Sequence, residues 1–226
     1  MTPMSDDQSM PWWQEFIAFD TETTGVDPAT DRIVTAAVVR FGGGQPVDER
    51  EWLVKVDVPI PAVSTEVHGI TDEHAQANGI DPRQALGEMH EYLTSSGLPI
   101  VAFNAPFDIA MLNANLIRYG LSAIDGIAIM CPYVIDKHLD KYVKGRNQRR
   151  LMPTIQRYGL QLDEDSWHGA TADARITGEL FLAQMDRFPD LRGYSPSDLS
   201  SDIAIWRDQQ EADFQQWLAT KRAEEA

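Results

Sequence analysis

The first third of the chain alternates between short apolar runs and polar connections. An apolar run over 16–19, a β-branched run over 33–41 and an alternating stretch over 47–56 predict three strands. The glycine-rich segment 42–46 is typical of a hairpin between the second and third of them. The pattern therefore predicts an antiparallel meander of three strands, which Pro59 and Pro61 end.

Strand and helix patterns alternate in the region that follows. Apolar runs over 99–103 and 127–131 predict two further strands, and residues 65–71 are expected to form a loop that leads into a helix. The expected helices are an element that begins at Asp81-Pro82 and ends near 95–97, and segments at 104–112, 132–143, 151–158 and 170–185. Strands joined through helices predict an α/β fold, with a mixed five-stranded sheet flanked by helices.

The two ends of the chain differ from its centre and predict three parts. Residues 1–11 are expected to be a flexible leader, 12–186 the main domain, and 187–226 a linker and an extra C-terminal amphipathic helix. The apolar residues of that last helix fall roughly on one side: Leu199, Ile203, Trp206, Phe214, Trp217 and Leu218. This side is expected to pack onto the domain, with a partner or self-association surface as the alternative.

Composition narrows the class of protein. The chain has 226 residues, 43% of them apolar, and no apolar run approaches the length of a membrane span, so we expect a soluble protein with no membrane partner. Its one cysteine, Cys131, cannot form an internal disulfide and is expected to be a small buried side chain. This favours a reducing, cytoplasmic location.

The charge distribution is uneven. The formal net charge of −16 argues against strong bulk attraction to a nucleic-acid backbone. However, six of the 19 basic residues lie between positions 137 and 150, accompanied by His138: Lys137, Lys141, Lys144, Arg146, Arg149 and Arg150. Such a run is either a solvated loop or a local surface that, together with bound metal ions, holds one end of a nucleic-acid strand.

Two carboxylates follow the first apolar run. Asp20 and Glu22 are two residues apart on a predicted strand, so both side chains point to the same face. Their repulsion and desolvation are costly unless a cation lies between them, and Mg²⁺ or Mn²⁺ prefers such oxygen ligands. The alternative is a solvated strand end. Asp-Thr also occurs in the Asp-Thr-Gly of aspartic proteases, but Glu22 replaces that glycine, which excludes this class.

Further acids and a histidine occur near predicted helix starts. Asp108 falls in the first turn of an apolar helix, where the helix dipole alone would explain it. Asp173 lies early in the helix predicted over 170–185, and His168 precedes that helix on a loop. In isolation none of these residues indicates catalysis.

Four segments together resemble the motifs of a known family. Residues 19–25, 67–71, 104–108 and 168–173 are similar, in order and spacing, to the motifs of the DEDDh (DnaQ-like) 3′-5′ exonucleases. This family includes the proofreading subunit of bacterial DNA polymerase III. The resemblance covers about residues 14–186 and implies a ribonuclease H-like fold.

The resemblance also implies roles for individual residues. Asp20, Glu22, Asp108 and Asp173 would hold two Mg²⁺ or Mn²⁺ ions, and His168 would be the general base. The positions that would flank the terminal nucleotide are Thr23, Val67, His68, Asn104 and Phe107. One departure concerns Lys137, because the family commonly has Thr at this place, and a substrate contact there is in doubt.

The sequence thus predicts a metal-dependent 3′-to-5′ exonuclease. It is expected to release nucleoside monophosphates from single-stranded 3′ ends, with DNA favoured over RNA. The alternatives are an exoribonuclease and a non-catalytic nucleic-acid-binding or scaffolding subunit on the same fold. A replication or repair protein is the partner considered for the C-terminal helix.

Overall fold

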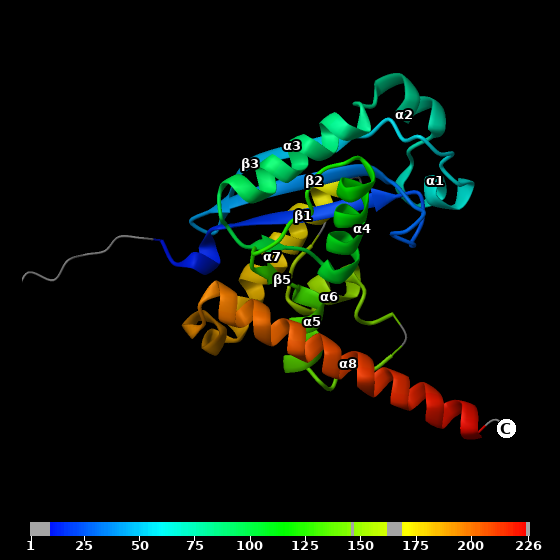
Figure 1. The fold of residues 1–226 in the computed structure, drawn as a ribbon. Helices are drawn as coiled ribbons and strands as arrows, with labels where there is room; N and C mark the ends of the chain where they lie inside the picture. Colours follow the sequence, from blue (N-terminus) through cyan, green and yellow to red (C-terminus); the bar gives the residue numbers. More distant parts are fainter. Residues whose placement is uncertain (1–9, 146, 162–168, 225–226) are drawn as a thin grey trace, which may run out of the picture.

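A mixed five-stranded sheet, in the order β3-β2-β1-β4-β5, forms the centre of the computed structural model (Figure 1). The structure describes residues 10–145, 147–161 and 169–224. The strands are β1 (Phe16–Thr23), β2 (Ile33–Gly42), β3 (Gln45–Leu53), β4 (Ile100–Val101) and β5 (Ile129–Met130). The first three form the antiparallel meander, while β4 and β5 continue the sheet in parallel with β1. The predicted fold is confirmed.

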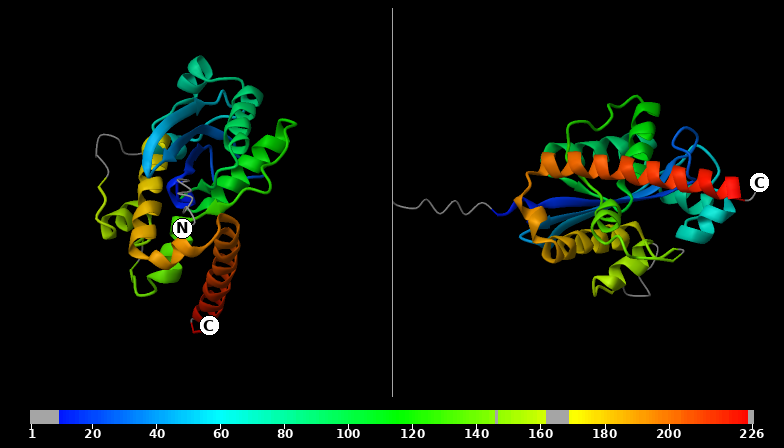
Figure 2. Two further views of the ribbon diagram at one scale, coloured as in Figure 1. Left: turned by 90° about the vertical axis from the view of Figure 1, so that its left-hand side faces the viewer. Right: turned by 90° about the horizontal axis from the view of Figure 1, so that it is seen from below.

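Helices cover both faces of this sheet. Figure 2 shows α3 (Pro82–Ser95) and α4 (Ala105–Arg118) on one side and α7 (Ala170–Arg187) on the other. The buried residues of β1 alternate accordingly. Ile17 and Phe19 belong to the core on the side of α3 and α4, while Phe16 and Ala18 belong to the core under α7. The strand is therefore buried on both faces until it reaches its acidic end.

Helix α7 lies unusually close to the sheet at Gly178. A β-carbon at this position would overlap the ring of Phe41 on β2. That ring is fixed in turn, because it stacks on Phe16 with a centroid distance of 4.7 Å. The absence of a side chain at Gly178 thus sets the distance between the sheet and the helix that begins at Ala170.

The structure corrects several expected boundaries. Residues expected in a loop at 65–71 belong largely to α1 (Ala62–His68), and α2 (Asp72–Asn78) starts where Thr71 accepts a hydrogen bond from the His74 amide. Sequence patterns did not predict α1, because this helix is rich in β-branched residues and has no side-chain cap. Helix α5 (Pro132–Leu139) ends before 143, and α6 covers Leu151–Arg157.

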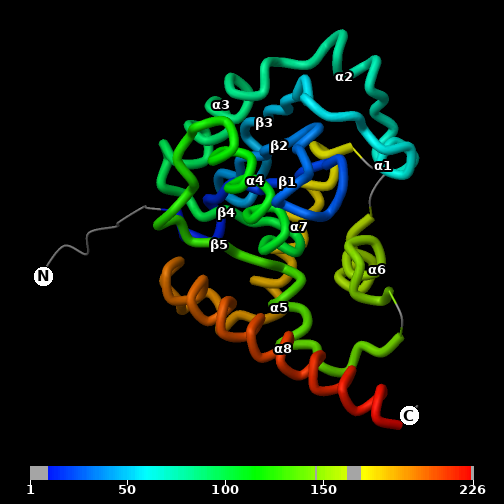
Figure 3. Tube along the Cα trace, turned by 45° about the vertical axis from the view of Figure 1, so that its right-hand side comes forward, coloured from blue at the N-terminus to red at the C-terminus, as the bar shows by residue number. Residues whose placement is uncertain are grey.

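The C-terminal region consists of a 3₁₀ helix, Pro189–Gly193, and the long helix α8 (Pro196–Glu224). The start of α8 runs beside α5 and β5, whereas its end projects beyond the domain (Figures 1 and 3). Leu199 and Ile203 are buried, but Phe214 and Trp217 are 46% and 53% exposed. The single apolar side expected for this helix therefore divides into a packed half and an exposed half.

Near the other end of the chain, a short 3₁₀ helix, Trp12–Gln14, precedes β1, and the Trp12 indole donates a hydrogen bond of 2.8 Å to the Tyr194 carbonyl oxygen. Most of the leader expected over 1–11 lies outside the described residues.

Cys131 is buried, as expected. None of the helices in the described ranges has both the length and the apolar composition that a membrane crossing requires.

Candidate active site

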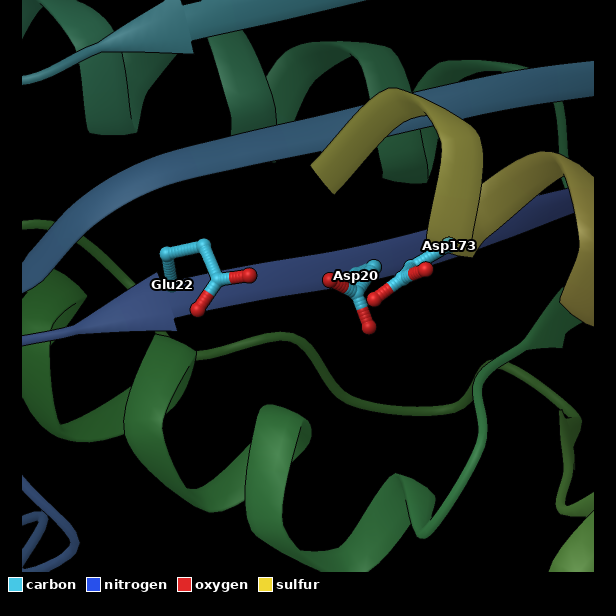
Figure 4. Close-up of side chains that lie close together, drawn as sticks. All are labelled: Asp20, Glu22 and Asp173. Atoms are coloured by element: carbon cyan, nitrogen blue, oxygen red, sulfur yellow. The ribbon is translucent and has the colours of Figure 1, made fainter. Parts of the chain in front are cut away.

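Three carboxylates meet where β1 passes under the start of α7. Asp20 and Glu22 extend from the same side of β1, and Asp173 reaches them from the first turn of α7 (Figure 4). One carboxylate oxygen from each residue lies within 4.8 Å of the other two. This separation allows all three side chains to contact one cation.

The fourth predicted acid, Asp108, approaches from the other side of the strand. It lies in the first turn of α4, is 4% exposed, and accepts a hydrogen bond of 2.8 Å from the Thr21 hydroxyl. Thr21 stands between Asp20 and Glu22 in the sequence but points away from them, because side chains alternate along a strand. Sequence reasoning did not assign Thr21 a role, although this alternation was available as a signal.

The raised pKa values of these acids show that their carboxylates are buried close to one another. Burial, followed by the charges of Asp108, Asp173 and Glu22, raises the pKa of Asp20 well above its usual value. Burial and the charges of Asp173 and Asp108 raise the pKa of Glu22 to about 7. The pKa of Asp108 is also raised to about 7, by burial, against the opposing effect of the Thr21 hydrogen bond.

Such raised pKa values mean that the carboxylates destabilise one another when all are ionised. A divalent cation among them would remove this cost and would hold the acids in their charged form. The donor set, three carboxylates with a fourth alongside, consists of hard oxygen ligands. The residues present therefore fit a hard divalent metal ion.

The predicted general base, His168, lies outside the described residues. Gly169, the first described residue after it, precedes the first residue of α7. Asp173 follows Gly169 by one helical turn, and its amide donates a hydrogen bond of 3.0 Å to the Gly169 carbonyl oxygen. The role of His168 stays a prediction.

Two of the predicted substrate residues lie on α1, which is tied to the end of β1. The Ser64 hydroxyl of α1 donates a hydrogen bond of 2.8 Å to the Thr24 carbonyl oxygen. His68 is buried at the end of α1, and burial lowers its pKa against the opposing effect of the Thr23 backbone. Val67, by contrast, is 52% exposed. The Thr23 hydroxyl donates to the Gly25 carbonyl oxygen at 2.6 Å.

Two further predicted substrate residues, Asn104 and Phe107, lie at the start of α4. Asn104 is exposed and has a left-handed backbone conformation, with φ of 62°. Its carbonyl oxygen accepts a hydrogen bond from the Phe107 amide at 2.9 Å, and Phe107 is partly buried against the core. Because Asn104 and Asp108 are one helical turn apart, both lie at the same end of α4.

Part of the basic run serves the structure. Asp136 is buried on α5 and forms ion pairs of 2.6 Å with Arg149 and with Arg157. The Tyr158 hydroxyl donates to the same carboxylate at 3.1 Å. Arg149 therefore holds α5 against the segment before α6. Of the two alternatives considered for the basic run, the solvated loop is wrong for this residue.

Comparison with known sequences places these motifs in context. A sequence model described as "Exonuclease" matches residues 17–181. The DNA polymerase III PolC-type of Thermotoga maritima is 34% identical over 74% of this chain and 12% of its own length. The corresponding protein of Streptococcus sanguinis is 30% identical over 83% of this chain and 12% of its own length. The chain thus spans about an eighth of these relatives.

Solved structures show the same fold. Exonuclease I of E. coli, in complex with a dT13 oligonucleotide, has a TM-score of 0.67 and 19% identity, over 78% of this chain and 43% of that one. Exonuclease X, in complex with 5′ overhanging duplex DNA, has a TM-score of 0.61 and 22% identity, over 83% of this chain and 98% of that one. These likenesses confirm the ribonuclease H-like arrangement.

Proposed function

Because this chain belongs to the exonuclease family, whose sequence model covers residues 17–181, we propose that it is a metal-dependent 3′-to-5′ exonuclease. It would hydrolyse the last phosphodiester bond of a single-stranded DNA and release a nucleoside 5′-monophosphate. The observation that carries this proposal is the meeting of Asp20, Glu22 and Asp173 within 4.8 Å. Crowded carboxylates of this kind suit phosphodiester hydrolysis assisted by divalent metal ions.

The acids would bind the metal ions, and His168 would transfer the proton. Asp20, Glu22, Asp173 and Asp108 would hold two Mg²⁺ or Mn²⁺ ions beside the terminal phosphate. When bound, such ions lower the pKa of a water molecule and stabilise the departing oxygen. His168 would accept the proton of the attacking water. As the new bond to phosphorus forms, the bond to the 3′ oxygen breaks, and that oxygen takes a proton from solvent.

The substrate residues would position the terminal nucleotide. Asn104 and Phe107 lie at the end of α4 that carries Asp108, so a nucleotide held by them would present its phosphate to the acids. Thr23, Val67 and His68 would contact the same nucleotide from the end of β1 and from α1. The buried His68 is expected to be neutral, because burial lowers its pKa.

DNA is the proposed substrate in preference to RNA. The relatives are named as DNA polymerases, and the structural neighbours include exonuclease complexes with DNA. An exoribonuclease would require contacts to the 2′-hydroxyl group. We place the enzyme in the cytoplasm, since a lone buried cysteine suits a reducing compartment.

The deciding experiment is digestion of 5′-labelled single-stranded DNA and RNA of one sequence, with Mg²⁺ or Mn²⁺. We expect a ladder of shortened products that requires metal, forms faster on DNA, and is lost in Asp20→Asn and in His168→Ala. Asp190→Asn is the matched control, because this exposed residue follows the far end of α7. Absence of a ladder on both strands would contradict the proposal and favour a non-catalytic binding subunit.

A replication or repair protein remains the proposed partner of α8. The rings of Phe214 and Trp217 stack on each other at 6.0 Å and are 46% and 53% exposed. We expect the double variant Phe214→Ser/Trp217→Ser to lose binding to the replicative polymerase of the same organism, measured by calorimetry. Equal binding by the variant would contradict this surface, and concentration-dependent dimerisation lost in the variant would point to self-association instead.

A further inference from the structure

A groove of about 470 Å³ lies between α5 and α8, away from the acidic site. Its lining combines three cations with an aromatic side chain: Lys137, Lys141, Arg149 and Trp206, together with His138 and Asp213. We propose that this groove holds the single-stranded substrate on the 5′ side of its terminal nucleotides. The inference rests on the proposed function and extends it, because it assigns a path to the strand.

The charges of the groove favour an anion. Arg149 is engaged by Asp136, but none of the ion pairs among the described residues includes Lys137 or Lys141. Burial and the nearby Arg149 lower the pKa of Lys137. A phosphate placed between these cations would relieve their repulsion, as it does in other nucleic-acid grooves.

Acidic residues also face the groove and limit its positive charge. Asp213 lines it, and Asp213 and Glu211 both raise the pKa of Lys137. Both acids lie on α8, whereas Lys137 lies on α5 and Lys141 just after it. The backbone phosphates are therefore expected on the α5 side of the groove, next to the two lysines.

A line of aromatic side chains connects the groove to the catalytic end of α4. Phe103, which precedes Asn104, contacts Tyr133 edge-on with a centroid distance of 5.8 Å. The Lys137 amine lies 5.9 Å from the Tyr133 ring centroid. Further along α5, His138 stacks on Trp206 of α8 at 4.0 Å.

A surface on which aromatic rings alternate with cations suits the binding of single-stranded nucleic acid. Bases stack on aromatic rings without regard to sequence, while lysines follow the phosphates. The order of these groups, from Asn104 across α5 to α8, suits a strand whose 3′ end lies at the acids and whose 5′ part crosses the groove. Trp206 and Asp213 lie outside residues 17–181, so one wall of this path belongs to the C-terminal helix.

The test compares strand lengths in the double variant Lys137→Gln/Lys141→Gln. Affinity for labelled DNA of roughly 4 and 20 nucleotides is measured by fluorescence anisotropy, with Ca²⁺ in place of the catalytic ion. We expect the Kd of the longer strand to rise on the order of tenfold, and the slope of log Kd against log salt to fall by about 1.4, or about 0.7 for each lost contact. The shorter strand should be affected much less.

The matched control is Arg40→Gln/Lys55→Gln, which removes two exposed cations elsewhere on the domain. Melting temperatures of both variants verify that each is folded. If the lysine variant binds the long strand as the wild type does, or weakens both lengths equally, the groove does not hold the strand. A groove that binds an acidic protein instead would also give the first of these results.

The outcome is separate from that of the proposed function. Binding in Ca²⁺ measures the groove without catalysis, whereas the digestion ladder measures catalysis at Asp20 and His168. A wild-type enzyme that degrades DNA, with a lysine variant of unchanged affinity, would overturn only the groove. A wild type that forms no ladder, together with a lysine variant that loses affinity for the longer strand only, would overturn only the exonuclease.

Discussion

The Thr21 hydroxyl donates a hydrogen bond of 2.8 Å to Asp108, and this bond connects the acidic strand to helix α4. Thr21 is the residue between Asp20 and Glu22, yet it acts on the opposite side of β1. The bond holds the Asp108 carboxylate at a place where its charge raises the pKa of Asp20 and Glu22. It also lowers the pKa of Asp108 itself, against the effect of burial. Thr21 is thus a positioning residue.

Thr21→Val should weaken metal binding without removing a ligand. Valine has nearly the same shape as threonine but donates no hydrogen bond, so the pKa of Asp108 should rise and protons should compete better with the metal. We expect the metal concentration for half-maximal activity to rise several-fold, on the order of one hydrogen bond's free energy, and more at pH 6 than at pH 8. Thr21→Ser keeps the donor and serves as the control. A variant with the same metal dependence as the wild type at both pH values would contradict this role.

The metal-free protein should lose stability as pH rises. Glu22 and Asp108 have folded pKa values of about 7, so the folded state binds more protons than the unfolded state between the usual carboxyl pKa and 7. Stability therefore falls across that range, and the loss is complete above pH 7. For Glu22 alone the difference is on the order of 3 kcal/mol.

Divalent metal should reverse this trend. Melting temperatures measured with EDTA and with Mn²⁺ from pH 5 to pH 8 should differ least at low pH and most at high pH, by several degrees at about 2–4 °C for each kcal/mol. Asp20→Asn should raise the metal-free melting temperature at pH 8, because it removes one of the mutually repelling charges. A metal effect that does not depend on pH would show that the acids do not share an ion.

Much of this site follows from local sequence rules, and the rest depends on long-range packing. Alternation along β1 predicts that Asp20 and Glu22 share a face, and the structure confirms it. Local sequence rules do not reveal that the helix of Asp173 approaches β1 closely enough for a third carboxylate to join them. That approach depends on Gly178 against Phe41, two residues far apart in the chain. Only the family resemblance of residues 168–173 predicted that Asp173 would share a metal ion with Asp20 and Glu22.

Helices α1 and α8 show the same limit in different ways. The β-branched composition of α1 hides it from propensity rules, although its contact with the Thr24 carbonyl oxygen stabilises it in the fold. In α8, Ile203 and Phe214 both belong to the apolar side that the sequence pattern predicts. Only Ile203 is buried against the domain, whereas Phe214 is exposed. A periodic pattern predicts which side of a helix is apolar and does not predict how far along the helix that side is covered.

The buried Asp136 should stabilise the region between α5 and α6. Two arginines depend on its carboxylate, and both are mostly buried, with side chains 17% and 22% exposed. Asp136→Asn should lower the free energy of unfolding by roughly 3 kcal/mol, because it leaves two partly buried cations without a counter-charge. Urea denaturation measures this loss, with Asp48→Asn as a control for an exposed acid. A change below about 1 kcal/mol, typical of surface pairs, would contradict a structural role.

Gly178→Ala changes a residue in the core, and it should nevertheless alter the geometry of the active site. The added β-carbon would overlap the Phe41 ring, which cannot turn aside because it stacks on Phe16. The variant must move α7 outward or strain the core, at a cost of about 1–3 kcal/mol. Since Asp173 lies on α7, the shift should also separate it from Asp20 and weaken metal binding.

Two companion variants identify the cause. Gly87→Ala on α3 introduces the same methyl group at a helical glycine with open space around it, and should raise stability by about 0.5–1 kcal/mol. Phe41→Leu/Gly178→Ala makes room for the new methyl group and should recover part of the metal affinity that Gly178→Ala loses. Metal titration monitored by melting temperature measures both effects. If Gly178→Ala loses stability but keeps the metal affinity of the wild type, the position of α7 does not control the distance between Asp173 and β1.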